Sequence, residues 1–94
     1  MGLQLVVSYD VVDDYRRMRL SKFLRGYLDR VQKSVFEGVI PERRLEDLRA
    51  GVSKRIDQTE DSVRIYPLCV RCRGVVEVIG TGTYLDDDVK DVVV

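Results

Sequence analysis

The sequence predicts an α+β domain: a four-stranded antiparallel sheet with two helices on one face and a short extra strand near the C-terminus. Three observations predict it. The chain has 94 residues, enough for one domain with one modest core. Its hydrophobic fraction of 45% and charged fraction of 34% are ordinary for a folded protein. Segments with the alternation of a strand are interspersed with segments that have the spacing of a helix.

The first strand is expected at residues 3–10, where large apolar side chains alternate with a mixed set. One face carries Leu3, Leu5, Val7 and Tyr9, and the other carries Gln4, Val6, Ser8 and Asp10. A helix follows, with Asp13 or Asp14 as its cap, and runs to about residue 28. Its buried stripe is expected to comprise Leu20, Phe23, Leu24, Tyr27 and Leu28.

A second strand is expected at residues 31–40, with Val31, Val35 and Val39 on one face. Pro41 ends this strand, because it cannot donate to a sheet ladder, and a second helix follows at 42–55. The inward side chains of this helix are Leu45, Leu48 and Val52. Gly51 is expected to weaken its last turn.

Third and fourth strands are expected at residues 62–68 and 75–79, followed by a turn and an extra strand around Tyr84. Residues 1–85 then form the folded domain, and the acidic residues 86–94 form a tail that we expect to be flexible.

We interpret these elements as the β-α-β-β-α-β, or ferredoxin-like, arrangement. Two helices cover only one face of such a sheet. The open face is expected to carry Val6, Ser8, Phe36, Tyr66 and Leu68, a set too apolar to remain in water. A symmetric homodimer packed through this face would bury it, with the C-terminal strand along the partner's sheet edge.

The basic residues are concentrated, although the formal net charge is zero. Between positions 16 and 33 a single acid, Asp29, stands against seven cations: Arg16, Arg17, Arg19, Lys22, Arg25, Arg30 and Lys33. This distribution suits phosphate contact on one face of a neutral molecule, with a solvated helix face as the alternative.

Other classes of function are disfavoured. The chain has no histidine, the commonest general acid or base. Cys69 and Cys72 supply only two of the four ligands of a zinc site, so we favour two ordinary reduced cysteines over a redox pair or a zinc site shared across a dimer.

No apolar run approaches the roughly 20 residues of a membrane span, and the apolar N-terminal segment lacks a cationic flank. We therefore expect a cytoplasmic protein that does not bind membranes.

Asp10 is the candidate centre of a functional site, because it ends its strand where no core residue is needed. Arg17 lies two helical turns before Leu24 and is therefore aligned with the buried stripe at the end nearest Asp10. Arg17 could bind a phosphate there, or it could form a structural salt bridge with Asp10. Magnesium needs few carboxylates, and a symmetric dimer would supply a second Asp10.

Three segments of the chain resemble a known family. The segment YDVVDDYRRMR (residues 9–19), the segment DRVQKSVFEG (29–38) and the VEVIG strand (76–80) resemble the second CRISPR-associated core protein, the small adaptation nuclease that accompanies the spacer integrase. The resemblance spans essentially the whole chain. It implies a ferredoxin-like homodimer that uses Mg²⁺, or another divalent cation such as Mn²⁺, to cleave phosphodiester bonds of RNA or DNA in antiviral defence.

The resemblance also implies site residues. Asp10 takes the place of the family's metal aspartate, and the other matching positions are Tyr9, Arg17, Arg19, Arg30, Ser34 and Phe36. Phe36 could stack on a base, although we favour packing across the dimer.

Three functions remain open at this point. The first is a metal-dependent endonuclease, and the second is a non-catalytic scaffold that binds duplex DNA and bridges integrase subunits. The third, a regulatory domain that binds a small effector, lacks a glycine-rich ligand loop.

Overall fold

The computed structural model describes residues 2–68 and 79–80. Its elements, in chain order, are β1 (Gly2–Asp10), α1 (Asp14–Arg25), β2 (Asp29–Gln32), β3 (Val35–Pro41), a short 3₁₀ helix η1 (Glu42–Arg44), α2 (Leu45–Arg55) and β4 (Ser62–Leu68). The strand expected at 75–79, the extra strand, the acidic tail and both cysteines lie outside the described residues, Ile79 excepted. Within the described part, no helix is long and apolar enough to cross a membrane.

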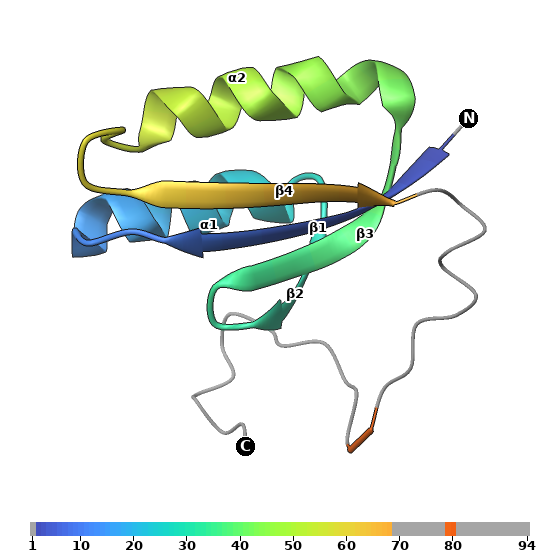
Figure 1. Ribbon diagram of the computed structural model, residues 1–94, viewed down its shortest axis with the longest axis horizontal. Helices are drawn as coiled ribbons and strands as arrows, with labels where there is room; N and C mark the ends of the chain where they lie inside the picture. Colours follow the sequence, from blue (N-terminus) through green and yellow to red (C-terminus); the bar gives the residue numbers. More distant parts are fainter. Residues whose placement is uncertain (1, 69–78, 81–94) are drawn as a thin grey trace.

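The sheet confirms the predicted fold class. Its strand order is β2-β3-β1-β4, and every described pairing is antiparallel. The ribbon shows α2 running above β4 while α1 lies behind β1 (Figure 1). The order β-α-β-β-α-β is thus complete by residue 68, so the strand at 62–68 is the fourth strand and not the third.

The prediction of a single strand at residues 31–40 is wrong. The chain instead forms a hairpin, β2 and β3, that turns at Lys33 and Ser34. Tyr9 fixes this turn from β1: its N–H donates to Ser34 O at 3.1 Å, and its hydroxyl donates to Lys33 O at 3.2 Å. One uninterrupted strand would have left only one strand between the helices, whereas the ferredoxin-like order requires two.

Helix α1 begins as expected and ends early. Asp13 caps it, because its side chain accepts the N–H of Arg16 at 2.9 Å. The helix ends at Arg25, and Gly26, its C-cap, keeps a right-handed conformation with its N–H bonded to Phe23 O at 3.1 Å. The chain leaves through a bond from Leu28 N–H to Leu24 O at 2.8 Å. Leu28 lies beyond the helix but remains buried, so the predicted apolar stripe holds.

The core lies between the helices and one face of the sheet. It contains Leu5, Val7, Tyr9, Val11, Leu20, Leu24, Leu28, Phe36, Ile40, Leu48 and Val52. Gly51 is buried in α2 and belongs to this packing. A Cβ at Gly51 would lie 2.0 Å from the ring of Phe23, so the two helices approach closely at this position.

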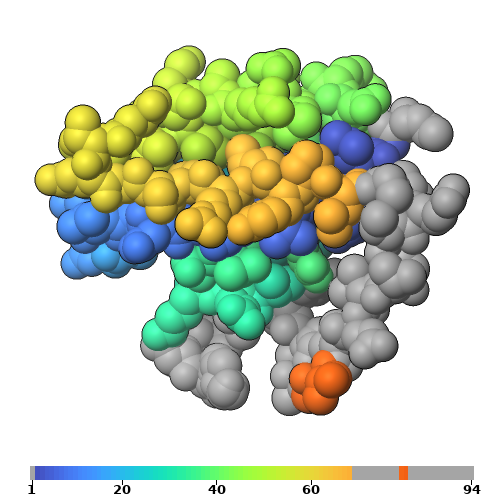
Figure 2. All heavy atoms as spheres, viewed as in Figure 1, coloured from blue at the N-terminus to red at the C-terminus, as the bar shows by residue number. Residues whose placement is uncertain are grey.

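The other face of the sheet carries no described helix. Val6 is opposite Tyr66, which is 46% exposed, and Val39 is 43% exposed. Figure 2 shows the side chains of β4 forming a continuous strip beside α2.

Phe36 was placed on this open face, and that placement is wrong. Phe36 is opposite Val7 in the sheet register and is fully buried under the helices. Alternation separates Phe36 correctly from Val35 and Val39, but it cannot tell which of the two faces the helices cover.

Candidate functional site

A cleft lies where β1 ends, between α1 and the β2–β3 turn. Its volume is about 640 Å³, and the residues that line it are Tyr9, Asp10, Val11, Asp14, Arg17, Met18, Ser21, Arg25, Arg30, Lys33 and Ser34. Three segments that are separate in the sequence therefore converge on the end of one strand.

The cleft brings together most of the predicted site residues: Tyr9, Asp10, Arg17, Arg30 and Ser34. Arg19 does not line it. Its guanidinium lies 5.8 Å from the ring centroid of Tyr15, on the exposed surface of α1. Phe36 does not line it either, because the side chain is fully buried behind Tyr9, with ring centroids 6.2 Å apart. A contact between Phe36 and a base would therefore require the core to open.

Tyr9 forms the floor of the cleft and holds the β2–β3 turn. Burial raises the pKa of its phenol, and this effect outweighs the hydrogen bond with Ser21 and the positive charge of Arg30, both of which lower the pKa. Tyr9 therefore stays protonated at neutral pH and donates to Lys33 O.

Arg17 does not form the salt bridge with Asp10 that was one of two alternatives. Its guanidinium pairs with Asp14 at 2.6 Å and donates to the carbonyl oxygens of Val11 at 3.2 Å and Val12 at 3.3 Å. Arg17 thus ties the first turn of α1 to the loop that follows β1. Asp10 itself is exposed at the end of its strand, opposite Ser62.

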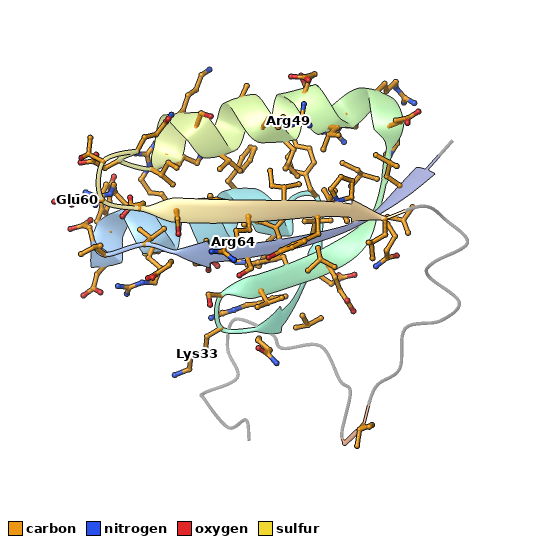
Figure 3. The ribbon with its side chains drawn as sticks, in the orientation of Figure 1. Lys33, Arg49, Glu60 and Arg64 are labelled. Atoms are coloured by element: carbon orange, nitrogen blue, oxygen red, sulfur yellow. The ribbon has the colours of Figure 1, made fainter. Side chains whose placement is uncertain are left out.

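Among the described residues, four cations line the cleft against two carboxylates. The cations are Arg17, Arg25, Arg30 and Lys33, and the carboxylates are Asp10 and Asp14. An excess of positive charge next to an exposed carboxylate suits a ligand that is a polyanion, alone or with a cation. Figure 3 shows the Lys33 side chain projecting from the β2–β3 turn, away from the sheet.

Several lining residues were not predicted as site residues. Asp14, Ser21 and Arg25 share one face of α1 with Arg17, at spacings of three, four and four residues. Helical periodicity applied from Arg17 would have found them. Lys33 was missed as a site residue because its turn was interpreted as the middle of a strand.

Arg16 corrects the expectation of one continuous cationic face. Its Nε donates to Asp61 Oδ2 at 2.8 Å, and its Nη2 donates to Asp61 Oδ1 at 3.2 Å and to Glu60 at 3.1 Å. The Asp61 side chain is 0% exposed, and its hydrogen bonds with Arg16 hold the pKa of that carboxyl well below its usual range. Arg16 therefore serves the fold and is not available to phosphate.

The described residues contain no group of three or more histidine, cysteine, aspartate or glutamate side chains that could hold a metal ion. A metal in the cleft would be held by Asp10, with water and substrate phosphate as its other ligands. That donor set fits Mg²⁺, which binds through one or two carboxylates, water and substrate phosphate.

The comparisons with known proteins identify the family. A family model described as "CRISPR associated protein Cas2" matches residues 3–76. The chain belongs to the Cas2 family. The resemblance seen in the sequence motifs is therefore confirmed.

Curated Cas2 relatives match over most of the chain. A Thermus thermophilus protein named "CRISPR-associated endonuclease Cas2 2" is 47% identical over 87% of this chain and 88% of its own length. A Chloroflexus aurantiacus protein named "CRISPR-associated endoribonuclease Cas2 3" is 47% identical over 72% of this chain and 73% of its own.

Solved structures agree with the fold. A hypothetical protein from Thermus thermophilus superposes with a TM-score of 0.77 at 42% identity, covering 88% of this chain and 96% of that one. Cas2 of Streptococcus pyogenes gives a TM-score of 0.71 at 30% identity, covering 82% of this chain and 99% of that one. A chain of a partial Cas6-RT-Cas1–Cas2 complex gives a TM-score of 0.67 at 30% identity, covering 82% of this chain and 84% of that one.

Proposed function

We propose that this protein is a metal-dependent endonuclease of CRISPR adaptation that cleaves phosphodiester bonds with Mg²⁺ or Mn²⁺ bound at Asp10. One observation carries the proposal: an exposed carboxylate, Asp10, shares a cleft with four cationic side chains. The names of the relatives support it, because they describe an endonuclease and endoribonucleases. A divalent cation would activate water and neutralise phosphate charge, tasks for which a chain without histidine has few alternatives.

The residues of the cleft divide the work by position. Arg25, Arg30 and Lys33 neutralise and orient the phosphodiester backbone, because charge-assisted bonds to phosphate are strong and directional. Tyr9 shapes the floor and holds the turn that carries Lys33. Arg17 fixes the loop next to Asp10 through the carbonyl oxygens of Val11 and Val12.

The working unit that we propose is a homodimer. The open sheet face supplies an apolar surface that includes Val6, Val39 and Tyr66, and dimerisation through it would bury these side chains. Sedimentation at micromolar concentration should give about twice the 10.8 kDa of one chain, and a monomer would overturn both the dimer and a paired Asp10 site.

A cleavage assay on matched substrates tests the activity. The same sequence is offered as single- and double-stranded RNA and DNA, with Mg²⁺, with Mn²⁺ and with a chelator. We expect metal-dependent cleavage of at least one substrate that the chelator abolishes. Cleavage that persists in the chelator would contradict the metal requirement.

A non-catalytic scaffold is the second candidate, since one chain with this fold was solved as part of a complex that includes Cas1 and Cas2. Phosphate binding by the cationic cleft serves a scaffold equally well. Binding of nucleic acid and of the spacer integrase, without cleavage of any of the four substrates, would favour this function.

A further inference from the structure

Asp61 is a buried carboxylate that the proposed chemistry does not use. It lies between α2 and β4 and accepts four hydrogen bonds: from Val12 N–H at 3.0 Å, from Asp57 N–H at 2.8 Å, and from Arg16 Nε and Nη2 at 2.8 and 3.2 Å. Ionised carboxylates accept about four such bonds, so this one is saturated.

We propose that Asp61 and Arg16 are positioning residues for Asp10 and act through the loop of residues 11–13. Val12 is the link, because its peptide groups are held from opposite sides. Its N–H donates to Asp61, and its carbonyl oxygen accepts from Arg17, which lines the cleft. This inference rests on the proposed function where it concerns cleavage, but its effect on the loop does not.

The loop has little freedom of its own. It joins the end of β1 to the start of α1 in three residues, with Val11 buried and Asp13 capping the helix. Of its bonds within the described residues, the loop without Asp61 would keep those from Arg17 and the Asp13 cap. The orientation of the Asp10 side chain depends on the backbone that follows it, so a more mobile loop would let this side chain take a wider range of orientations.

The sheet register places Asp61 next to the site. Asp10 is the last residue of β1 and is opposite Ser62, the first residue of β4, which follows Asp61 directly. Asp61 therefore lies beside the paired ends of β1 and β4, where the cleft opens, and is bonded to the loop that follows β1. Figure 3 shows Glu60 at this end of the molecule, where the α2–β4 loop meets the start of α1.

The test uses Asp61→Asn, with Glu60→Gln as the matched control. Glu60 contacts the same arginine, but its side chain is 56% exposed, and it makes no described contact with the loop. Three quantities are measured well below the melting temperature of each variant: backbone ¹⁵N relaxation of residues 11–13, the Mn²⁺ midpoint for broadening of the Asp10 amide signal, and kcat and KM for cleavage.

In Asp61→Asn we expect a more mobile loop, a Mn²⁺ midpoint about 10- to 100-fold higher and a lower kcat, as found when residues that orient metal ligands are changed. KM for nucleic acid should stay within about twofold, because the cleft cations are untouched, and Glu60→Gln should match the wild type. A folded Asp61→Asn protein with an ordered loop and an unchanged Mn²⁺ midpoint would overturn the inference.

Failure of the proposed function gives a different result, since the wild type would then show neither Mn²⁺ broadening at Asp10 nor cleavage. The relaxation of residues 11–13 in Asp61→Asn still decides the positioning role in that case. If Asp61→Asn does not fold, Arg16→Gln replaces it, because this milder change removes two of the four hydrogen bonds that hold the Asp61 side chain and leaves those from Val12 and Asp57. Arg16→Gln should raise the Mn²⁺ midpoint, or the loop mobility if no Mn²⁺ binds, and wild-type values would overturn the inference.

Discussion

Replacement of Phe36 separates a role in the core from a role in base stacking. The side chain is 0% exposed, is opposite Val7 in the sheet and stacks on Tyr9 with an interplanar angle of 28°. Deletion of a buried phenyl ring costs about 3–5 kcal/mol of unfolding free energy. At about 4–8 °C per kcal/mol for a domain of this size, Phe36→Ala should lower the melting temperature by at least about 12 °C.

Phe36→Leu distinguishes the two roles, since it keeps most of the apolar volume and loses the ring. A core role predicts a cost of about 1–2 kcal/mol, from lost packing and stacking on Tyr9, with nucleic-acid affinity unchanged at a temperature where the protein is folded. Base stacking would be worth about 1–3 kcal/mol of binding, a loss of about 5- to 150-fold in affinity. Thermal melts and fluorescence anisotropy on one preparation measure both. A Phe36→Leu protein with a near-native melting temperature and weakened binding would refute the core assignment.

Three further predictions follow from individual contacts. Because burial raises the pKa of Tyr9, the contribution of this phenol to stability is present below about pH 10 and is lost as pH rises further. Between pH 9 and 11 the melting temperature should therefore fall less steeply with pH for Tyr9→Phe than for the wild type. Gly51→Ala should lower the melting temperature, because the new Cβ meets the ring of Phe23. Helix propensity alone predicts the opposite, a gain of up to about 1 kcal/mol in the free energy of unfolding, so a higher melting temperature would contradict this packing. Lys33→Ala, at a cation that lines the cleft, should reduce the salt dependence of nucleic-acid binding by about one phosphate contact, while Arg16→Gln should leave it unchanged. An equal reduction by both would contradict the structural role of Arg16.

Much of the fold could be predicted from the sequence, because the apolar spacing in β1 and α1 is regular. The hairpin at residues 33–34 could not, since the alternation of residues 31–40 hides a turn that contacts from Tyr9 stabilise. The wrong face for Phe36 has the same origin: periodicity reports two faces, and only tertiary packing decides which one is covered.

The candidate site was predictable to the extent that it is local. Asp10 and Arg17 lie at the end of one strand and in the helix after it, and their convergence followed from spacing. Tyr9 was found as a site residue only through the family resemblance. The pairing of Arg16 with Asp61 joins residues 45 positions apart, and no local pattern distinguishes Arg16 from its exposed neighbours. The charge run was therefore interpreted as one face, although the structure divides it between the cleft, the surface and a buried ion pair.

Asp10→Asn tests the central claim most directly, with Asp47→Asn as a control at an exposed aspartate on α2 that is not part of the cleft. Cleavage by both variants is measured with saturating Mg²⁺ or Mn²⁺ on the substrate that the wild type cuts best, with the melting temperature recorded on the same samples. Asp10→Asn should lose cleavage by orders of magnitude while it stays folded and binds nucleic acid at least as well, because one anion leaves the phosphate path. Asp47→Asn should cleave like the wild type. Undiminished cleavage by a folded Asp10→Asn protein would contradict the assignment of Asp10 as the metal ligand.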